Sequence, residues 1–166
     1  MKLEKDSTSL KMTKKISFTF ANQSNLSEIQ NLLKQNKLPF EDIETSKVVF
    51  IVAVADNQLI GSIGIEEKEG DGLLRSFAVT EEYKNKGVGT KLFNELIKYT
   101  ISKGIYTLHI LTTSAENYFS KKGFKKVDRK MAPLKIQQTT EFSTLCPSSS
   151  IYMTLSNINN NASVTT

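Results

Sequence analysis

Two glycines in the segment 79–92, VTEEYKNKGVGTKL, follow a lysine-rich stretch in a pattern that is typical of anion binding. Gly87 and Gly89 are separated by one residue, and an amphipathic run begins directly after them. If a helix starts here, the backbone N–H groups of residues 85–90 converge at its positive end, where a pyrophosphate is stabilised by hydrogen bonds and the helix dipole. The sequence therefore predicts a phosphate site, with a plain strand-to-helix turn as the alternative.

The spacing excludes two common nucleotide motifs. A P-loop requires a lysine directly after its second glycine and then Ser or Thr, whereas Thr90 and Lys91 follow Gly89 in the opposite order. A dinucleotide fold requires three glycines in a tight turn directly after a strand, but Leu92 occupies the place of the third glycine.

Arg75 interrupts the apolar segment 73–79, LLRSFAV, which is expected to be a buried strand. A buried guanidinium is costly unless it is paired, and its planar fork suits a carboxylate or a similar oxyanion. The sequence predicts that Arg75 binds substrate, with an internal salt bridge to a neighbour such as Glu66 as the alternative. Further candidates for the substrate pocket are Ser76, Thr112, Thr113 and Arg129, the last of which has a surface position as its alternative.

Candidate proton-transfer groups are few. Glu116, near the start of a short predicted helix, is a candidate base, although it suits a helix N-terminus equally well. A water-relayed Glu66 is a second candidate. The single histidine, His109, lies among apolar residues of a predicted strand, which favours a hydrogen-bonded core histidine. The single cysteine, Cys146, is expected to be a small buried side chain.

Composition limits the class of protein. The 166 residues, 39% hydrophobic, suit one domain, and the single cysteine and single histidine predict no disulfide and no metal centre. The net charge of +5 concentrates in residues 121–135, which suits a local anion site or a solvated face better than a nucleic-acid surface. No apolar run resembles a signal peptide or a membrane span, so a cytoplasmic protein without membrane contact is expected.

Apolar periodicity predicts a mixed α/β sheet, mostly antiparallel, in which an antiparallel meander feeds a crossover helix. A working domain is expected over 16–155, with flexible tails at 1–15 and 156–166. Strands are expected at 16–20, 48–55, 58–67, 73–79, 105–113, 124–128 and 150–156, and helices from 25, from 88 to Gly104, over 114–123 and over 133–143.

The segments FAVTEEYKNKGVGTKL and AENYFSKKGF resemble the two signatures of the GNAT superfamily of acyl-CoA-dependent N-acetyltransferases. The resemblance implies splayed central strands, acetyl-CoA as cosubstrate, and a direct attack of an amine on the thioester. The tyrosine that many members use as the acid falls on Phe119, so the adjacent Tyr118 is a candidate acid, with water or no acid as the alternative. The residues implied for coenzyme binding are Phe77, Ala78, Val79, Lys84, Asn85, Lys86, Gly87, Val88, Gly89 and Thr90.

The segments LLRSFAV, LTTSAENYF, KVDR and EFSTLCPSS further resemble a GNAT subgroup associated with arsenic resistance, itself similar to glutamate-acetylating enzymes. This implies a small, anionic, amino-acid-like acceptor, such as an organoarsenical analogue of glutamate, and a monomer or homodimer. For Cys146, the alternative to a buried structural side chain is that its thiol contacts trivalent arsenic. The other functional alternatives are an amino-acid acetyltransferase unrelated to arsenic and a catalytically silent CoA-binding module.

Overall fold

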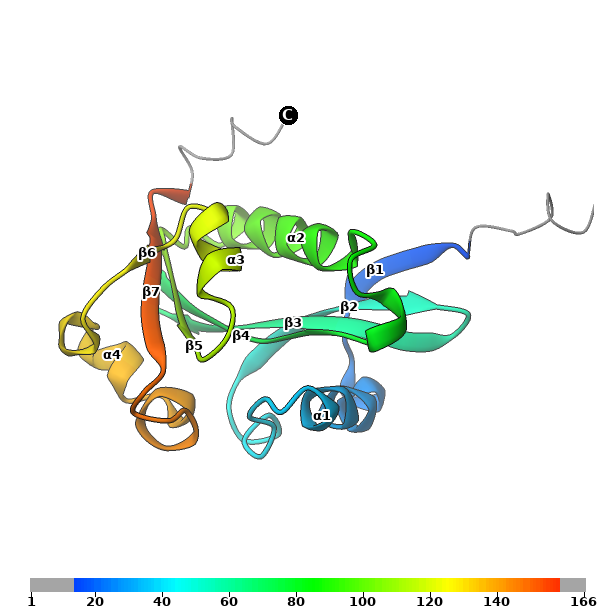
Figure 1. The fold of residues 1–166 in the computed structure, drawn as a ribbon, viewed down its shortest axis with the longest axis horizontal. Coiled ribbons are helices and arrows are strands. Elements are labelled where there is room, and N and C mark those ends of the chain that lie inside the picture. The colour runs from blue at the N-terminus through cyan, green and yellow to red at the C-terminus, as the bar shows by residue number, and fades with distance from the viewer. Residues whose placement is uncertain (1–13, 159–166) are drawn as a thin grey trace, which may run out of the picture.

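The computed structural model describes residues 14–158, which form one mixed sheet with helices on both faces (Figure 1). The strands lie in the order β1-β2-β3-β4-β5-β7-β6, and the neighbouring pairs in this part of the chain are antiparallel except β4 and β5. The predicted mixed, mostly antiparallel sheet is confirmed. Its strands are β1 (Ile16–Phe20), β2 (Val48–Ala55), β3 (Gln58–Lys68), β4 (Asp71–Val79), β5 (Thr107–Thr112), β6 (Lys125–Lys126) and β7 (Ile151–Ser156).

Two amphipathic helices cover opposite faces of this sheet (Figure 1). α1 (Leu26–Gln35) buries Ile29 and Leu33 against one face, and α2 (Val88–Ser102) buries Leu92 and Leu96 against the other. In each helix the buried residues are three or four positions apart, so they form one apolar stripe. The shorter helical segments are Gln23–Asn25, Glu81–Tyr83, α3 (Glu116–Lys121), Arg129–Met131, α4 (Leu134–Gln137) and a π-helical turn, Glu141–Leu145.

The β2–β3 hairpin turns at Asp56 and Asn57, which both have positive φ angles, of 51° and 60°. Such a two-residue turn matches the right-handed twist of the strands. It leads into a three-strand meander, since β3 pairs with β4 from Lys68 and Asp71 onward.

β4 and β5 separate along their length. They pair in parallel over Asp71–Leu73 and Thr107–His109, and the ladder between them ends there. β5 continues to Thr112 along β7, while β4 continues to Val79 along β3, so the two strands open a wedge in the sheet. This confirms the splayed central strands that the family resemblance implied.

Several expected boundaries change. The helix expected over 133–143 is broken into α4 and the π-helical turn, because Thr139 uses its hydroxyl to donate to the Ile136 carbonyl and to accept from the Phe142 N–H. At the C-terminal boundary, Ser156 belongs to β7 and Ile158 is buried in the core. The expected flexible tails lie mainly at 1–13 and 159–166, outside the described residues, and stay predictions.

Candidate active site

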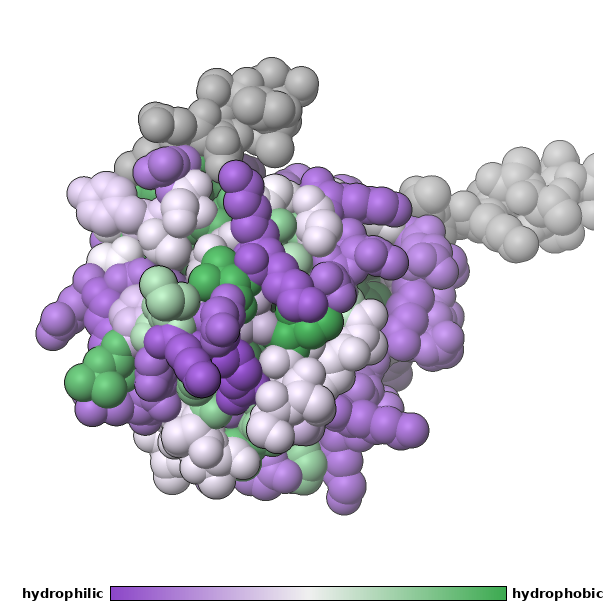
Figure 2. All heavy atoms as spheres, turned by 60° about the vertical axis from the view of Figure 1, so that its left-hand side comes forward, coloured by the Kyte–Doolittle hydropathy of each residue, from purple (hydrophilic) through white to green (hydrophobic). Residues whose placement is uncertain are grey.

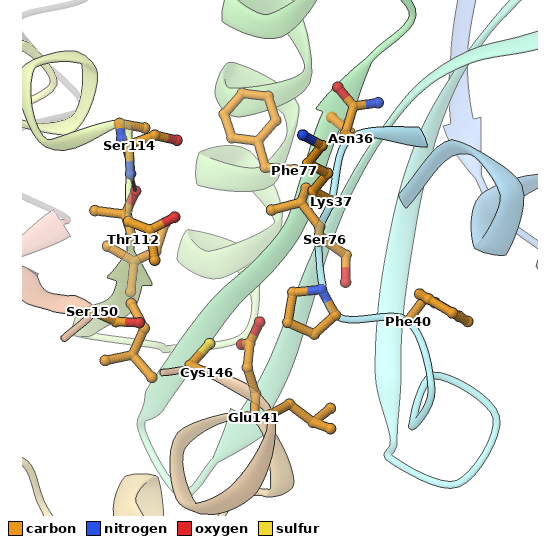
Figure 3. A pocket seen from close by; sticks show the side chains of 18 of the residues that line it. Asn36, Lys37, Phe40, Ser76, Phe77, Thr112, Ser114, Glu141, Cys146 and Ser150 are labelled. Carbon is orange, nitrogen blue, oxygen red and sulfur yellow. Dashed lines mark hydrogen bonds between the residues drawn. The ribbon is translucent and has the colours of Figure 1, made fainter. Parts of the chain in front are cut away.

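A cleft of about 720 Å³ lies in the wedge between β4 and β5, a volume typical of small-molecule sites. Figure 3 shows Ser76 and Phe77 of β4 on one side and Thr112 and Ser114, at the end of β5, on the other. The remaining residues that the cleft brings together include Lys34 in the last turn of α1, Asn36, Lys37 and Phe40 after α1, Lys84 and Gly89 near the start of α2, Tyr118 on α3, and Glu141, Cys146 and Ser150 before β7.

A β-bulge turns the backbone of β4 beside the cleft. The register with β3 shifts between the pairs Ser62–Ala78 and Gly64–Arg75, which leaves one extra residue in β4. Ser76 has a φ of 55°, and its carbonyl accepts a hydrogen bond of 2.8 Å from the Ser62 hydroxyl. A bulge of this kind interrupts the ladder and redirects the chain. The backbone at the predicted coenzyme positions 77–79 therefore lies beside the cleft, with the ladder of β4 locally interrupted.

The start of α2 has the geometry of an anion site. Gly87, with a φ of 83°, is the N-cap and supplies no side chain to cap the helix, so within residues 14–158 the first N–H groups of α2 have no side-chain cap. A Cβ at Gly89 would meet the Phe77 ring at an ordinary 3.5 Å, so there is space around this first turn. Lys84 lines the cleft and is paired with Glu81 at 2.7 Å. These features fit the phosphates of a coenzyme.

The predicted coenzyme residues therefore divide into two groups. Phe77, Ala78, Val79, Lys84 and Gly89 line the cleft itself. The others form the loop and first turn of α2, where Asn85 has a φ of 61° and Val88 is buried in the core. That second group is Asn85, Lys86, Gly87, Val88 and Thr90.

Arg75 is fully enclosed and paired inside the protein. Its Nη1 and Nη2 donate to both oxygens of Asp42 at 2.6 and 2.5 Å, and Nη1 also donates to Glu66 Oε1 at 2.7 Å. Burial opposes its charge, but these carboxylates raise the pKa of Arg75. The internal salt bridge with Glu66, the alternative kept open by the sequence, is present, and Arg75 is not among the residues lining the cleft.

Glu141 is the buried carboxylate that faces the cleft. It opens the π-helical turn, is 5% exposed, and in Figure 3 its side chain projects into the space between Thr112 and Ser76. Its Oε2 has no hydrogen-bond partner among the described residues and lies 4.0 Å from Arg75 Nε. Burial raises the pKa of Glu141 to about 7, against the opposing influence of Arg75.

Other predicted residues lie apart from this arrangement. His109 is a hydrogen-bonded core residue, with Nδ1 2.6 Å from the Tyr152 hydroxyl and Nε2 2.6 Å from Asp71 Oδ1, and burial lowers its pKa. Arg129 donates to the carbonyls of Pro147, Ser150 and Phe142, so it braces the segment before β7. Glu116 lies at the start of α3, outside the residues that line the cleft.

The candidate acid and hydroxyl groups do reach the cleft. Tyr118 lines it beside Phe77, with ring centroids 5.8 Å apart, and burial raises the pKa of its hydroxyl. Ser76, Thr112 and Thr113 line it as well, although the Thr112 hydroxyl accepts a hydrogen bond from the Ala115 N–H at 2.9 Å.

Three features therefore surround the cleft. They are the splayed parallel pair of β4 and β5, the bulge in β4, and the helix α2, which begins at a glycine. A family model described as Acetyltransferase (GNAT) family matches residues 18–127, which include all three features. The chain belongs to the acetyltransferase (GNAT) family. Among the described residues, no group of three or more His, Cys, Asp or Glu is arranged to hold a metal ion.

Curated relatives of this GNAT chain match it over part of their length. A probable N-acetyltransferase camello of Xenopus tropicalis is 27% identical over 113 residues, which cover 61% of this chain and 52% of that protein. An amino-acid acetyltransferase of Photorhabdus laumondii is 28% identical over 101 residues, covering 58% of this chain and 22% of that protein. The matched region thus spans about half of the first relative and less of the second.

Solved GNAT structures share the fold. N-acetylglutamate synthase from Neisseria gonorrhoeae, complexed with coenzyme A and N-acetyl-glutamate, aligns with a TM-score of 0.72 at 18% identity, over 86% of this chain and 35% of that chain. A GNAT family acetyltransferase from Staphylococcus aureus Mu50 aligns with a TM-score of 0.67 at 19% identity, over 86% of this chain and 99% of that chain.

Sequence reasoning missed several residues of the site. Asp42 gave no signal, because a single acid in a turn after α1 has no pattern that pairs it with Arg75. Glu141 lies in the phrase TEFSTLCPSS, which carries part of the subgroup resemblance, but it falls near the end of the helix expected over 133–143, and nothing in the sequence gives this acid a role. Lys34 and Lys37, which also line the cleft, read in sequence as ordinary polar positions near the end of a helix.

Proposed function

We propose that this protein is an acetyl-CoA-dependent N-acetyltransferase that acts on a small amine. The observation that carries the proposal is the cleft itself, which joins the open end of the β4–β5 wedge to the uncapped start of α2. Coenzyme A is a long molecule with phosphates at one end and a thioester at the other, and this cleft offers an anion site continuous with exposed strand backbone.

In this proposal the backbone does most of the binding. The first N–H groups of α2 hold the pyrophosphate, and residues 77–79 bind the pantetheine arm through the backbone beside the bulge. The amine is held near the thioester carbonyl, and positioning of this kind supplies about 7–11 kcal/mol of the barrier. Tyr118 is retained as a candidate donor of a proton to the departing sulfur.

For the acceptor, we propose a small amino-acid-like amine. Two relatives support this class by name, an amino-acid acetyltransferase and an N-acetylglutamate synthase complexed with N-acetyl-glutamate. The phrase TEFSTLCPSS, part of the resemblance to the arsenic-resistance subgroup, supplies Glu141, Cys146 and Pro147 to the cleft. We therefore propose that this phrase helps to select the acceptor. In the narrower form of the proposal, the acceptor is an organoarsenical amino acid.

An anionic group on the acceptor needs a cation other than Arg75, which is paired with Asp42 and Glu66 and does not line the cleft. Lys34 and Lys37 line the cleft near the end of α1 and are proposed for this role. Cys146 also lines the cleft, and burial raises the pKa of its thiol to about 12, which keeps it protonated at neutral pH.

The test combines turnover with coenzyme binding. Thiol release from acetyl-CoA is followed with glutamate, aspartate, neutral and basic amino acids, and phosphinate and arsinate analogues of glutamate. Gly89→Asp is compared with its isosteric neutral control, Gly89→Asn, by calorimetric titration with CoA. Asp is well tolerated in the first turn of a helix, so the variant folds, but its charge repels a phosphate by about 4 kcal/mol at 4 Å and an effective dielectric constant of 20.

We expect Gly89→Asp to bind CoA at least about 100-fold more weakly than Gly89→Asn. Equal affinities would place the phosphates elsewhere and remove the basis of the proposal. Coenzyme binding without thiol release for any acceptor would instead support the second candidate, a silent CoA-binding module, which Phe119 in place of the usual tyrosine favours.

A further inference from the structure

Two buried polar atoms at the end of the cleft away from α2 have no hydrogen-bond partner among residues 14–158. They are Oε2 of Glu141 and the hydroxyl oxygen of Ser150, and both residues line the cleft. Buried polar atoms without partners are uncommon, and each one requires an explanation. Figure 3 shows both residues at the same end, with Glu141 projecting into the cavity, so a bound polar group is the natural partner.

The charges around Glu141 favour a cation. Arg75 is the positive group next to it, and its Nη donors are already occupied by Asp42 of the turn after α1 and by Glu66 of β3. One guanidinium between two carboxylates leaves one net negative charge before Glu141 ionises. Cys146 stays neutral as a thiol, so an ionised Glu141 adds a second negative charge to this buried cluster. The lysines that line the cleft, Lys34, Lys37 and Lys84, come from α1, the turn after it and the loop before α2.

We propose that Glu141 binds the ammonium group of the acceptor and then takes its proton. This inference rests on the proposed N-acetyltransferase function and adds to it the group that prepares the amine. Two acids line the cleft, Glu41 and Glu141. Glu41 is exposed and accepts a hydrogen bond from the Phe40 N–H at 3.0 Å, whereas Glu141 is buried with Oε2 unpartnered among the described residues. The oxygens of Asp42 face Arg75, and Glu116 lies outside the lining residues.

The proton balance is simple. The Glu141 carboxylate accepts one proton from R–NH₃⁺ and becomes a neutral acid. The neutral nitrogen forms a bond to the acetyl carbon while the bond from that carbon to sulfur breaks. The second proton of the nitrogen goes to the departing sulfur, which leaves as the thiol, and Glu141 later returns its proton to water.

The location of the acid suits this role. A general base works best when its pKa lies near the operating pH, and burial holds Glu141 at about 7. Asp42 and Glu66 favour the protonated form of Glu141, and Arg75 favours its ionised form. These three residues therefore set the pKa of Glu141 without touching the acceptor. Their pairing also fixes the turn after α1 and β3 around the cleft.

The experiment compares Glu141→Gln with the wild type and with Glu95→Gln, which changes an acid on α2 outside the cleft lining. Glutamine has the same shape and removes a buried unpaired charge, so the variant is expected to fold. For the best acceptor of the panel, we expect kcat/KM to fall by about 10²–10⁴ in Glu141→Gln. The wild-type rise of kcat/KM with pH through about 7 is expected to disappear, and CoA affinity and the Glu95→Gln profile to stay as in wild type.

A second readout separates the ammonium contact from general disruption. In the CoA complex, Glu141→Gln is expected to weaken binding of L-glutamate by at least tenfold while leaving glutarate, which lacks the amine, unchanged. An unaltered kcat/KM and pH profile in Glu141→Gln, with an active wild type, would overturn the inference alone. Thiol release absent from the wild type for every acceptor would overturn the proposed function and this inference with it.

Discussion

Replacing Arg75 with methionine, an uncharged side chain of similar length, leaves Asp42 and Glu66 in the core without their cation. Both carboxylates are almost fully buried, and Arg75 contacts them at 2.5–2.7 Å. Breaking a buried ion pair by removing one partner costs about 3–5 kcal/mol, because the remaining charge is uncompensated. The variant therefore reports whether Arg75 serves the fold or the acceptor.

The size and pH dependence of the loss follow from protonation. Burial alone raises the pKa of Asp42, and the hydrogen bonds from Arg75 and Ser46 overcome this and lower it. Without Arg75, a carboxylate must take up a proton to stay buried, which costs about 4 kcal/mol at pH 7 for a group of reference pKa near 4, and about 1.5 kcal/mol at pH 5. Because the folded variant then holds an extra proton, its deficit grows as pH rises above the unfolded pKa.

Urea denaturation at pH 5 and pH 7 measures this deficit. A loss of about 4 kcal/mol shifts the unfolding midpoint by about 2 M at a typical m-value of 2 kcal/mol/M. Arg75→Lys is the matched control, since it keeps the charge but not the bidentate fork, and a smaller loss is expected. An unchanged unfolding free energy in Arg75→Met, together with a raised KM for the acceptor alone, would refute the structural role and restore Arg75 as a substrate residue.

Three further changes test the packing and the buried charges. Gly72→Ala brings a Cβ within 2.6 Å of Ile65 Cδ1, so a loss of about 1–3 kcal/mol in urea is expected, and Ile65→Val in the same chain is expected to recover part of it. Asp71→Asn weakens the contacts to His109 and Lys135 by about 1 kcal/mol. The loss is expected to shrink as pH falls, since His109 and Lys135 hold the pKa of Asp71 low and the wild type loses this stability on protonation. The free energy of unfolding of Glu141→Gln is expected to rise by about 2.5 kcal/mol relative to that of the wild type between pH 5 and pH 8. The reason is that the raised pKa of Glu141 makes the wild type lose stability as the pH rises toward 7. A difference that does not change with pH would mean that Glu141 titrates normally.

Local patterns predicted most of the fold. The Asp56–Asn57 turn and the β-branched run before it specify a hairpin from adjacent residues, and the stripe that contains Leu92 and Leu96 specifies α2. The prediction of one helix over 133–143 was wrong, because the Thr139 hydroxyl forms hydrogen bonds with backbone groups on both sides and breaks the helix. Helical periodicity gives no indication of which carbonyl a threonine hydroxyl selects.

The glycine-containing loop before α2 and the helix itself were determined by the sequence, because contiguous backbone groups form them and the glycines at 87 and 89 permit the geometry locally. The partners of Arg75 were decided by the tertiary structure, since Asp42 lies 33 residues away on another element and Glu141 lies farther still. The sequence indicated that a buried guanidinium needs an anion, but protein and substrate carboxylates satisfy that need equally well. Only the packing of the turn after α1, β3 and the π-helical turn around β4 places two carboxylates on Arg75 and leaves a third facing the cleft.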